Sequence, residues 1–235
     1  MAAGGVVLHP FAEPNAACED RRVSKTTIHL VRHGHVENPD RVLYGRLPGF
    51  HLSGSGREQA ALLGAWFAGR ELATVTASPL ERAQETAEAI AAPHGLQVRS
   101  ELRLIEASNV FEGIAGNLLW YLLRHPRALW ALRDVREPSW GERHVDLVER
   151  VHQVVDEVRA SHPGAESVLV SHQAPIWVAR RAFERLRVSV DPRRRRCALA
   201  SVTTLTFDDH ALLGVAYAEP AAAPLRGSDA GRAGA

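Results

Sequence analysis

The stretch TIHLVRHGHV, residues 27–36, places an arginine and two histidines directly behind a short apolar run. The run itself is predicted to be a strand buried on both faces, because near-continuous apolar segments are typical of strands in a parallel sheet. Arg32, His33 and His35 then surround Gly34. This cluster fits either a polar turn that closes the strand or an active site at the strand's carboxyl end, and the rest of the sequence has to decide between them.

Strand and helix character alternate along the rest of the chain. Besides the first strand, strands are predicted over residues 72–78, 96–99, 167–171, 199–207 and 212–218, and helices over residues 56–70, 79–94, 142–160 and 174–187. This alternation predicts an α/β protein, specifically a three-layer α/β/α sandwich with a mostly parallel central sheet. In such sheets, ligands bind beyond the carboxyl ends of the strands.

Three segments lie outside this alternating pattern. Residues 1–24 and 219–235 are rich in small residues and proline, and they are predicted to be a disordered arm and tail on a single domain of residues 25–218. Residues 106–140 hold two short amphipathic pieces that are broken at Pro126, which predicts a helical insertion that acts as a lid. Its apolar side chains are expected to pack against the core or, alternatively, to face an apolar leaving group.

The composition argues against several classes of protein. A formal net charge of +1 gives no indication of a nucleic-acid or membrane partner. Cys18 and Cys197 lie far apart and form neither a disulfide framework nor a metal-ligand pattern, which predicts a reducing, cytoplasmic location. No signal peptide is expected, and no apolar run approaches the roughly 18–20 residues that a membrane span needs. Nothing in the sequence indicates an oligomeric state.

Polar residues follow three of the predicted strands. Arg32 and His33 follow the first strand, Arg82 lies in the first turn of the helix after the strand at 72–78, and His172 follows the strand at 167–171. Because parallel strands end at one edge of the sheet, these side chains are expected to converge there. The amides at the start of the helix near Arg82 would also favour an anion at that edge.

Two arginines and two histidines at one point suit phosphoryl chemistry. An arginine fork matches phosphate oxygens and stays charged, and a neutral imidazole is a competent nucleophile near pH 7. The sequence has no P-loop, Asp-rich magnesium site or HExxH motif, so a covalent mechanism with no metal and no cofactor is predicted. Taken singly, each residue also fits a structural role: Arg82 as a solvated helix residue and Glu106 as a loop carboxylate. Only their joint placement favours an active site.

Four motifs carry a resemblance to a known family. They are LVRHG at 30–34, ASPLERAQETA at 77–87, LIEASNVFEG at 104–113 and LVSHQAPI at 169–176. In this order they resemble the landmarks of the histidine phosphatase superfamily, the phosphoglycerate-mutase-like proteins, over roughly residues 26–218. The stretches at 42–60 and 191–207 are similar to an actinobacterial phosphatase-like branch of that family. The resemblance implies the phosphoglycerate-mutase-like fold.

The resemblance also implies a role for each matching residue. His33 would be the nucleophile that becomes phosphohistidine. Arg32 and Arg82 would hold the phosphoryl oxygens, and His172 would donate to the same group. Glu106 matches the residue that gives a proton to the leaving oxygen and then takes one from the attacking water.

Further positions match the family's substrate-facing loops or depart from its pattern. Asn38, Gly45 and Arg46 fall in a substrate-facing loop, and Gln173 stands where glycine is common after the second histidine. Asn38 also lies one residue closer to the nucleophile than in the mutase pattern, which argues against a mutase reaction. His35 replaces an acid that many relatives carry, which predicts a more positive mouth of the site.

The leading hypothesis is a metal-independent phosphomonoesterase that acts on a small phosphorylated substrate. A cofactor-dependent phosphoglycerate mutase is the alternative, because residues 106–140 offer additional basic side chains for a bisphosphate, namely Arg124, Arg127, Arg133 and Arg136. A non-catalytic phosphate-binding protein is a third reading. The run Arg193–Arg196 is interpreted as a solvated loop, or alternatively as a basic patch near the site that attracts an anionic substrate.

Overall fold

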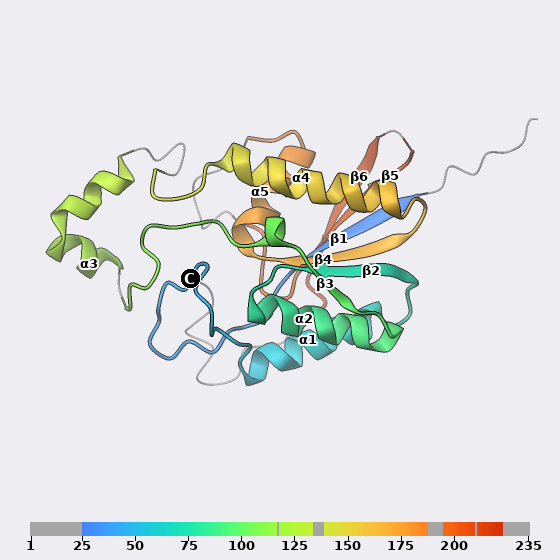
Figure 1. Ribbon diagram of the computed structural model, residues 1–235, viewed down its shortest axis with the longest axis horizontal. Helices are drawn as coiled ribbons and strands as arrows, with labels where there is room; N and C mark the ends of the chain where they lie inside the picture. Colours follow the sequence, from blue (N-terminus) through green and yellow to red (C-terminus); the bar gives the residue numbers. More distant parts are fainter. Residues whose placement is uncertain (1–24, 117, 134–138, 188–194, 210, 223–235) are drawn as a thin grey trace, which may run out of the picture.

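The computed structural model describes residues 25–116, 118–133, 139–187, 195–209 and 211–222. In this part of the chain six strands form one sheet in the order β3-β2-β4-β1-β5-β6 (Figure 1). The strands are β1 (Thr26–Arg32), β2 (Leu72–Ala77), β3 (Val98–Ser100), β4 (Glu166–Ser171), β5 (Val202–Phe207) and β6 (Leu212–Ala218). Strands β3, β2, β4 and β1 run parallel, while β5 and β6 complete the sheet antiparallel.

Helices cover both faces of the sheet. They are α1 (Gly54–Phe67), α2 (Glu81–Ala91), α4 (His144–Ser161) and α5 (Gln173–Phe183), with short turns η1 (Ala92–His94) and η2 (Leu102–Leu104). Helices α1 and α2 pack on one face and α4 and α5 on the other (Figure 1). The predicted fold class, an α/β sandwich with a mostly parallel sheet, is confirmed.

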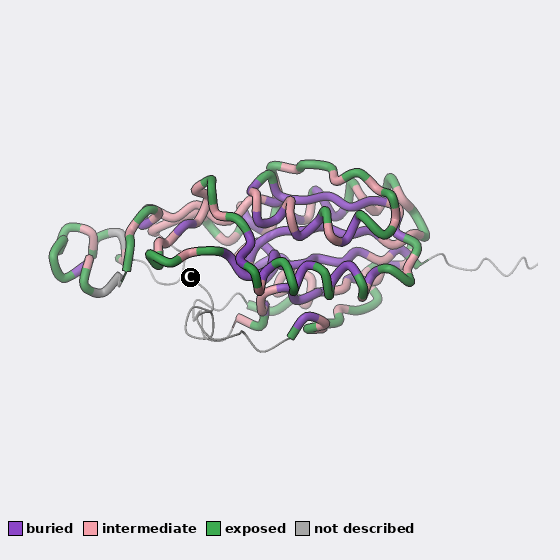
Figure 2. The backbone as a smooth tube through the Cα atoms, turned by 90° about the horizontal axis from the view of Figure 1, so that it is seen from below, coloured by how far each residue is buried: buried purple, intermediate pink, exposed green. Residues whose placement is uncertain are grey.

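The apolar character of β1 follows from its central place in the sheet. Ile28 and Leu30 belong to the core cluster that α4 and α5 share, whereas Val31 belongs to the cluster on the α1 and α2 face. His29 is also buried on the α1 side, where its ring packs edge-on against Phe67. Figure 2 shows the buried residues concentrated in the sheet between the two helical layers.

Two predicted helices differ in detail from the observed ones. The helix predicted over residues 142–160 is α4, which begins at His144 and ends at Ser161, and its buried stripe starts at Leu147, so that Val145 is 53% exposed. Helix α5 ends at Phe183 instead of residue 187, since Arg185 has a φ of +55° and leaves the helical conformation.

The domain also continues past the boundary at residue 218 that the sequence predicts. Residues 219–222 are described, and Ala221 is buried in the core cluster beside α1 and α2. The remaining tail and the arm of residues 1–24 lie outside the described residues.

The segment after Phe111 carries α3 (Leu118–Arg124) and η3 (Pro126–Leu132), the second being a 3₁₀ helix. Both lie at one end of the molecule, away from the sheet (Figure 1). The expectation that the apolar side chains here pack against the core is wrong for Trp120 and Trp130, which are 64% and 71% exposed. A helical excursion is thus present, as predicted, but its tryptophans lie at the surface.

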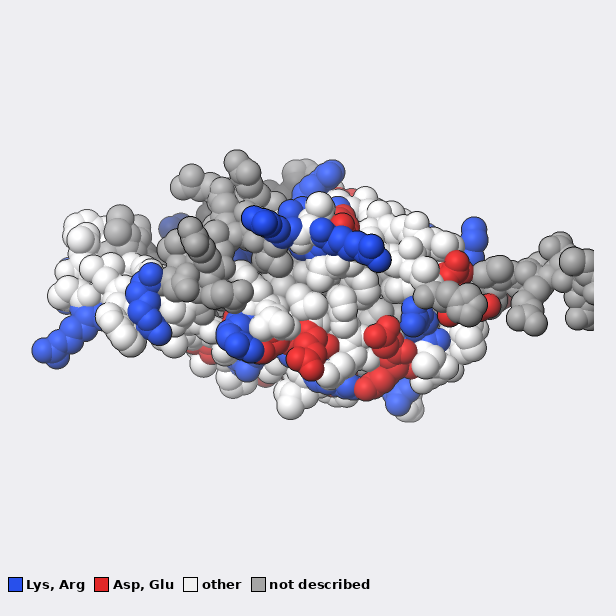
Figure 3. Space-filling model, turned by 90° about the horizontal axis from the view of Figure 1, so that it is seen from above, with Lys and Arg blue, Asp and Glu red and all other residues white. Residues whose placement is uncertain are grey.

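The surface carries charges of both signs. Basic and acidic side chains are interspersed on the face shown in Figure 3, in keeping with the small net charge of the chain. None of the helices formed by the described residues has the length and apolar character needed to cross a membrane.

Candidate active site

Three neighbouring parallel strands end together at one edge of the sheet. The N–H of His33, just after β1, donates to the carbonyl of Ser171 at the end of β4, at 3.1 Å. The N–H of Ser78, just after β2, donates to the carbonyl of Val170 at 2.9 Å. The residue after Ser171 is His172, so the sheet itself brings three of the sequence motifs into contact.

His33 is held as a neutral imidazole with one reactive nitrogen. The side chain is 2% exposed, and Nδ1 lies 2.7 Å from the carbonyl oxygen of Gly34. A carbonyl can only accept, so Nδ1 carries the proton and the lone pair lies on Nε2. Burial lowers the pKa of His33 well below its ordinary value, and the positive charges of Arg82 and Arg32 lower it further.

Gly34 is required by close packing behind this histidine. A Cβ at Gly34 would lie 2.7 Å from the backbone oxygen of Gly56 in α1. The N–H of Gly34 donates to the hydroxyl of Thr86 in α2 at 3.2 Å. The glycine therefore lets both helices approach the end of β1 and fix the position of His33.

The two arginines of the motifs are buried beside His33. Arg82, in the first turn of α2, is fully buried, donates from Nη2 to the carbonyl of Gly45 at 2.6 Å and lies 4.7 Å from the ring of Tyr44. Arg32 donates from Nη1 to the carbonyl of Cys197 at 2.7 Å. Burial lowers the pKa of Arg82, and the nearby Tyr44 and Glu106 partly oppose this lowering. A guanidinium nevertheless stays charged at working pH.

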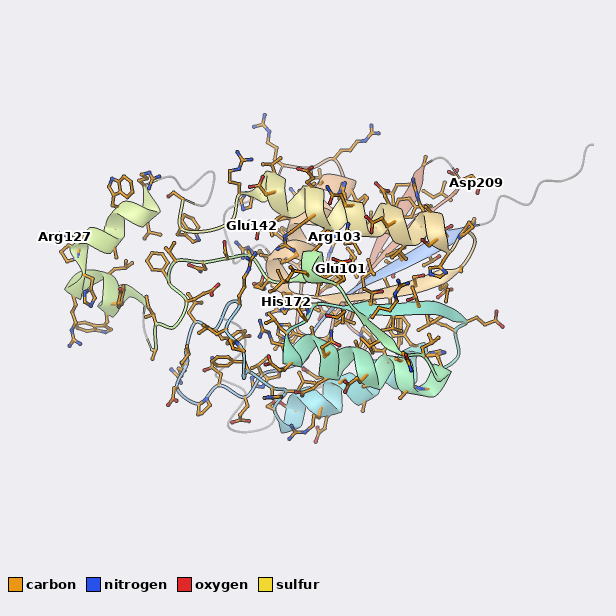
Figure 4. The ribbon with its side chains drawn as sticks, viewed as in Figure 1. Glu101, Arg103, Arg127, Glu142, His172 and Asp209 are labelled. Atoms are coloured by element: carbon orange, nitrogen blue, oxygen red, sulfur yellow. The ribbon has the colours of Figure 1, made fainter. Side chains whose placement is uncertain are left out.

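His172 lies between the end of β4 and the start of α5 (Figure 4). Its Nε2 is 2.7 Å from the hydroxyl oxygen of Ser78, which itself accepts from the N–H of Leu80. The tautomer in which the hydroxyl of Ser78 donates to Nε2 places the ring proton of His172 on Nδ1, where it can be donated to a bound anion. The rings of His33 and His172 are 5.1 Å apart, and burial above all lowers the pKa of His172 well below its ordinary value.

Four buried nitrogen atoms around His33 have no hydrogen-bond partner. They are Nε of Arg32, Nε and Nη1 of Arg82, and Nδ1 of His172. A buried donor without a partner costs about 1–3 kcal/mol, and more where the group is charged. A phosphoryl group would provide acceptor oxygens for all four, so this cluster has the chemistry of an anion site.

Glu106 is held at the mouth of this cluster by two arginines. Arg46 donates to the backbone carbonyl of Glu106 at 2.7 Å, and Arg150 donates to the same carbonyl at 3.4 Å. Both arginines also bind the carboxylate of Glu142, at 2.6 and 2.8 Å. The carboxylate of Glu106 accepts from the N–H of Ala107 at 2.8 Å. Arg46 thus supports the Glu106 loop instead of reaching the phosphate cluster.

The other residues predicted to face substrate have mixed positions. Asn38 uses both ends of its side-chain amide on the backbone of Val42, at 2.9 Å each, and so closes its own turn. Gly45 and Gln173 line a pocket next to Glu106. Gly45 has a φ of +38°, and a Cβ there would collide with the side chain of Glu112.

His35, which stands where many relatives carry an acid, lies behind the site at the start of α1. Its ring is buried, and Nδ1 lies 2.8 Å from the hydroxyl oxygen of Ser53. Ser53 is the N-cap of α1 and accepts from the N–H of Gly56. His35 therefore anchors the start of α1.

The pocket beside Glu106 has a volume of about 200 Å³. Its apolar walls come from loops and from α4 and α5, and include Leu43, Tyr44, Trp140, Leu147 and Val178. Sequence reasoning did not single out Tyr44, Ser78 or the inward placement of Arg195, which also lines this pocket. The only available signal for Arg195 was the arginine run, which does not indicate which member turns inward.

The sheet and the cluster define an α/β protein that gathers two arginines and two histidines at one edge of its sheet. Residues 28–219 match the histidine phosphatase superfamily (branch 1). The chain belongs to this family, and the resemblance seen in the sequence motifs is confirmed.

Phosphatases are among the relatives of this chain. An uncharacterized protein of Mycobacterium tuberculosis is 50% identical over 201 residues, covering 84% of this chain and 98% of that protein. Phosphoserine phosphatase 1 of Hydrogenobacter thermophilus is 33% identical over 156 residues, covering 63% of this chain and 71% of that protein. The solved structure of a mycobacterial glucosyl-3-phosphoglycerate phosphatase has a TM-score of 0.63 at 28% identity, covering 77% of this chain and 90% of that chain.

Proposed function

We propose that this protein is a metal-independent phosphomonoesterase that works through a phosphohistidine intermediate on a small phosphorylated substrate. The observation that carries the proposal is the set of unpartnered buried nitrogens of Arg32, Arg82 and His172 around the neutral ring of His33. The two guanidinium groups supply the positive charge that the developing charge on a phosphoryl group requires. Phosphatases among the relatives support the same class of reaction.

The proposed reaction starts from the neutral ring of His33. Nε2 of His33 attacks phosphorus, and the bond from phosphorus to the ester oxygen breaks as Glu106 gives its proton to that oxygen. Water then attacks the phosphohistidine, Glu106 takes the water's proton, and the bond from phosphorus to Nε2 breaks. Inorganic phosphate leaves, and His33 and Glu106 return to their starting states.

A mutase is less well supported than a phosphatase. It must bind a bisphosphate, which requires a second group of cations near the first. Arg127 lies on the α3–η3 segment, far from His172 (Figure 4), and Arg46 and Arg150 are already paired with Glu142. Arg136 lies outside the described residues.

The test is hydrolysis of p-nitrophenyl phosphate in the presence of EDTA. We expect activity in the unaltered protein, no turnover in His33→Ala, and an acid-quenched phosphohistidine that is absent from this variant. His94→Ala is the matched control, because His94 lies in η1, beyond the end of α2 that is remote from Arg82. Turnover by His33→Ala would refute the mechanism, and conversion of 3-phosphoglycerate faster than phosphate release would favour the mutase.

A further inference from the structure

Arg195 is a cation in the wall of the pocket beside Glu106. It lines the pocket, is partly buried, and its Nε has no hydrogen-bond partner. Its side chain forms no ion pair or hydrogen bond with any described residue. Burial lowers the pKa of Arg195, and the carboxylate of Glu106 opposes this effect most strongly, which places the two charges near each other.

The other charged groups of the pocket are already engaged. Glu142, at the mouth near the start of α4 (Figure 4), is bound by both Arg46 and Arg150. The carboxylate of Glu106 accepts from the N–H of Ala107 and opposes the lowering of the pKa of Arg82 as well as that of Arg195. Among the described residues that line the pocket, Arg195 is the only arginine, and its Nε has no hydrogen-bond partner.

We propose that the leaving group of the substrate carries a carboxylate that binds Arg195, while its phosphate occupies the cluster around His33. The proposal rests on the phosphatase function proposed above and names its substrate class. The planar fork of a guanidinium pairs with a carboxylate through two parallel hydrogen bonds.

The pocket favours a carboxylate over a second phosphate. A pocket of about 200 Å³ with apolar walls accommodates a small organic acid. A phosphate dianion would bring two negative charges to a pocket wall in which Arg195 is the only described arginine. A carboxylate adds one charge, which Arg195 alone neutralises.

The test compares esters that differ only at the carboxylate. Suitable pairs are 3-phosphoglycerate with glycerol 3-phosphate, and phosphoserine with phosphoethanolamine. We expect the unaltered enzyme to prefer the acidic member of each pair. Arg195→Met should lower kcat/KM for the esters that carry a carboxylate by about 10- to 100-fold, mainly through KM. It should change kcat/KM for the esters without a carboxylate, here called neutral, by less than about threefold. Arg195→Lys should retain part of the preference, because it keeps the charge without the fork.

Arg196→Met is the matched control. It removes the same charge at the next residue, which is exposed and lies 5.4 Å from the ring of Tyr217. We expect it to keep the unaltered preference. Loss of preference in Arg196→Met would mean that Arg195 acts only through the general field of the arginine run.

Two further outcomes would overturn the proposal. An equal loss on acidic and neutral esters in Arg195→Met would show that Arg195 acts through Glu106 or through the fold, and the absence of a preference in the unaltered enzyme would exclude a carboxylate subsite. Calorimetry can measure the affinity of the carboxylate subsite without turnover. The measurement compares the binding of 3-phosphoglycerate with that of glycerol 3-phosphate, in His33→Ala and in the double variant with Arg195→Met. Failure of the phosphatase mechanism is therefore distinguishable from failure of this inference.

Discussion

At the scale of single residues, the proposed mechanism requires His33 to be neutral and Glu106 to carry a proton at the same pH. Burial and two guanidinium groups keep His33 neutral, and its bond to Gly34 directs the lone pair of Nε2 away from the backbone. Glu106 lies on a loop that Arg46 and Arg150 hold through its backbone carbonyl, which leaves its carboxylate at the mouth of the site. His33 is thus enclosed by charged and polar groups, whereas the carboxylate of Glu106 lies in a pocket wall.

The role of Glu106 predicts a dependence on the leaving group. In Glu106→Gln, kcat/KM for an alkyl ester such as glycerol 3-phosphate should fall about 100-fold or more, because an alkoxide needs the proton that the amide cannot give. The value of kcat/KM for p-nitrophenyl phosphate should fall much less, since its phenolate leaves without protonation. The measurement is kcat/KM for both esters, which reports the step up to phosphoryl transfer. Equal losses would mean that Glu106 binds substrate without donating a proton.

The residues of the site differ in how well the sequence alone predicts them. Arg32, His33 and His172 could be found because each comes directly after a buried strand, and the topology then brings them together. Arg195 could not be found, because its burial depends on which arginine of a continuous run turns toward Glu106. Asn38 is placed in a substrate-facing loop by the resemblance alone, and its amide bonds within its own turn, which the sequence does not indicate.

At the scale of helices and strands, close backbone contacts fix the layer next to the site. A Cβ at Gly64 of α1 would lie 2.4 Å from the backbone oxygen of Ala89 in α2, so the two helices touch there through their backbones. The apolar pattern predicted that both helices exist, but not how closely they approach. It also placed the ends of elements imprecisely, as with α5, because the left-handed backbone at Arg185 has no clear sequence signal.

The contact between α1 and α2 predicts a stability loss for Gly64→Ala. The new methyl group forces the helices apart, and such overpacking costs about 1–3 kcal/mol, against which alanine recovers up to about 1 kcal/mol of helix propensity. Urea unfolding should show a lower midpoint with an unchanged slope. Gly54→Ala, in the same helix, meets no heavy atom within 4 Å and should be as stable as the unaltered protein or slightly more so. A Gly64→Ala protein with the midpoint of Gly54→Ala would disprove the close contact.

At the scale of the whole molecule, four histidines are buried or half-buried in three separate regions of the fold. Burial lowers the pKa of each of them. His29 lies between β1 and α1, His152 stacks on Phe183 between α4 and α5, and His33 and His172 lie at the sheet edge. Burial is the largest cause of the lowered pKa in all four. The folded protein therefore binds fewer protons than the unfolded chain as the pH falls below 6.5, the ordinary value for histidine.

This difference in proton binding predicts that the free energy of unfolding keeps the full contribution of these histidines above pH 6.5. The contribution decreases as the pH falls below 6.5. Between pH 6.5 and 5, each histidine that is protonated only in the unfolded chain lowers the free energy of unfolding by up to about 2 kcal/mol. The carboxylates with lowered pKa, such as Glu101 and Glu166, titrate mainly below this window, because their ordinary value is 4.5.

Urea unfolding in phosphate-free buffer at several pH values between 5 and 7.5 measures the effect. The free energy of unfolding should decrease steadily on the acid side, and less steeply in His33→Asn, which removes one of the buried titrating groups while keeping a polar side chain. Added inorganic phosphate should raise stability in the unaltered protein by binding the folded state alone. A free energy of unfolding that stays constant from pH 7 to 5 would mean that these imidazoles take up protons in the folded state, and His33 would then lack the neutral ring that the proposed attack requires.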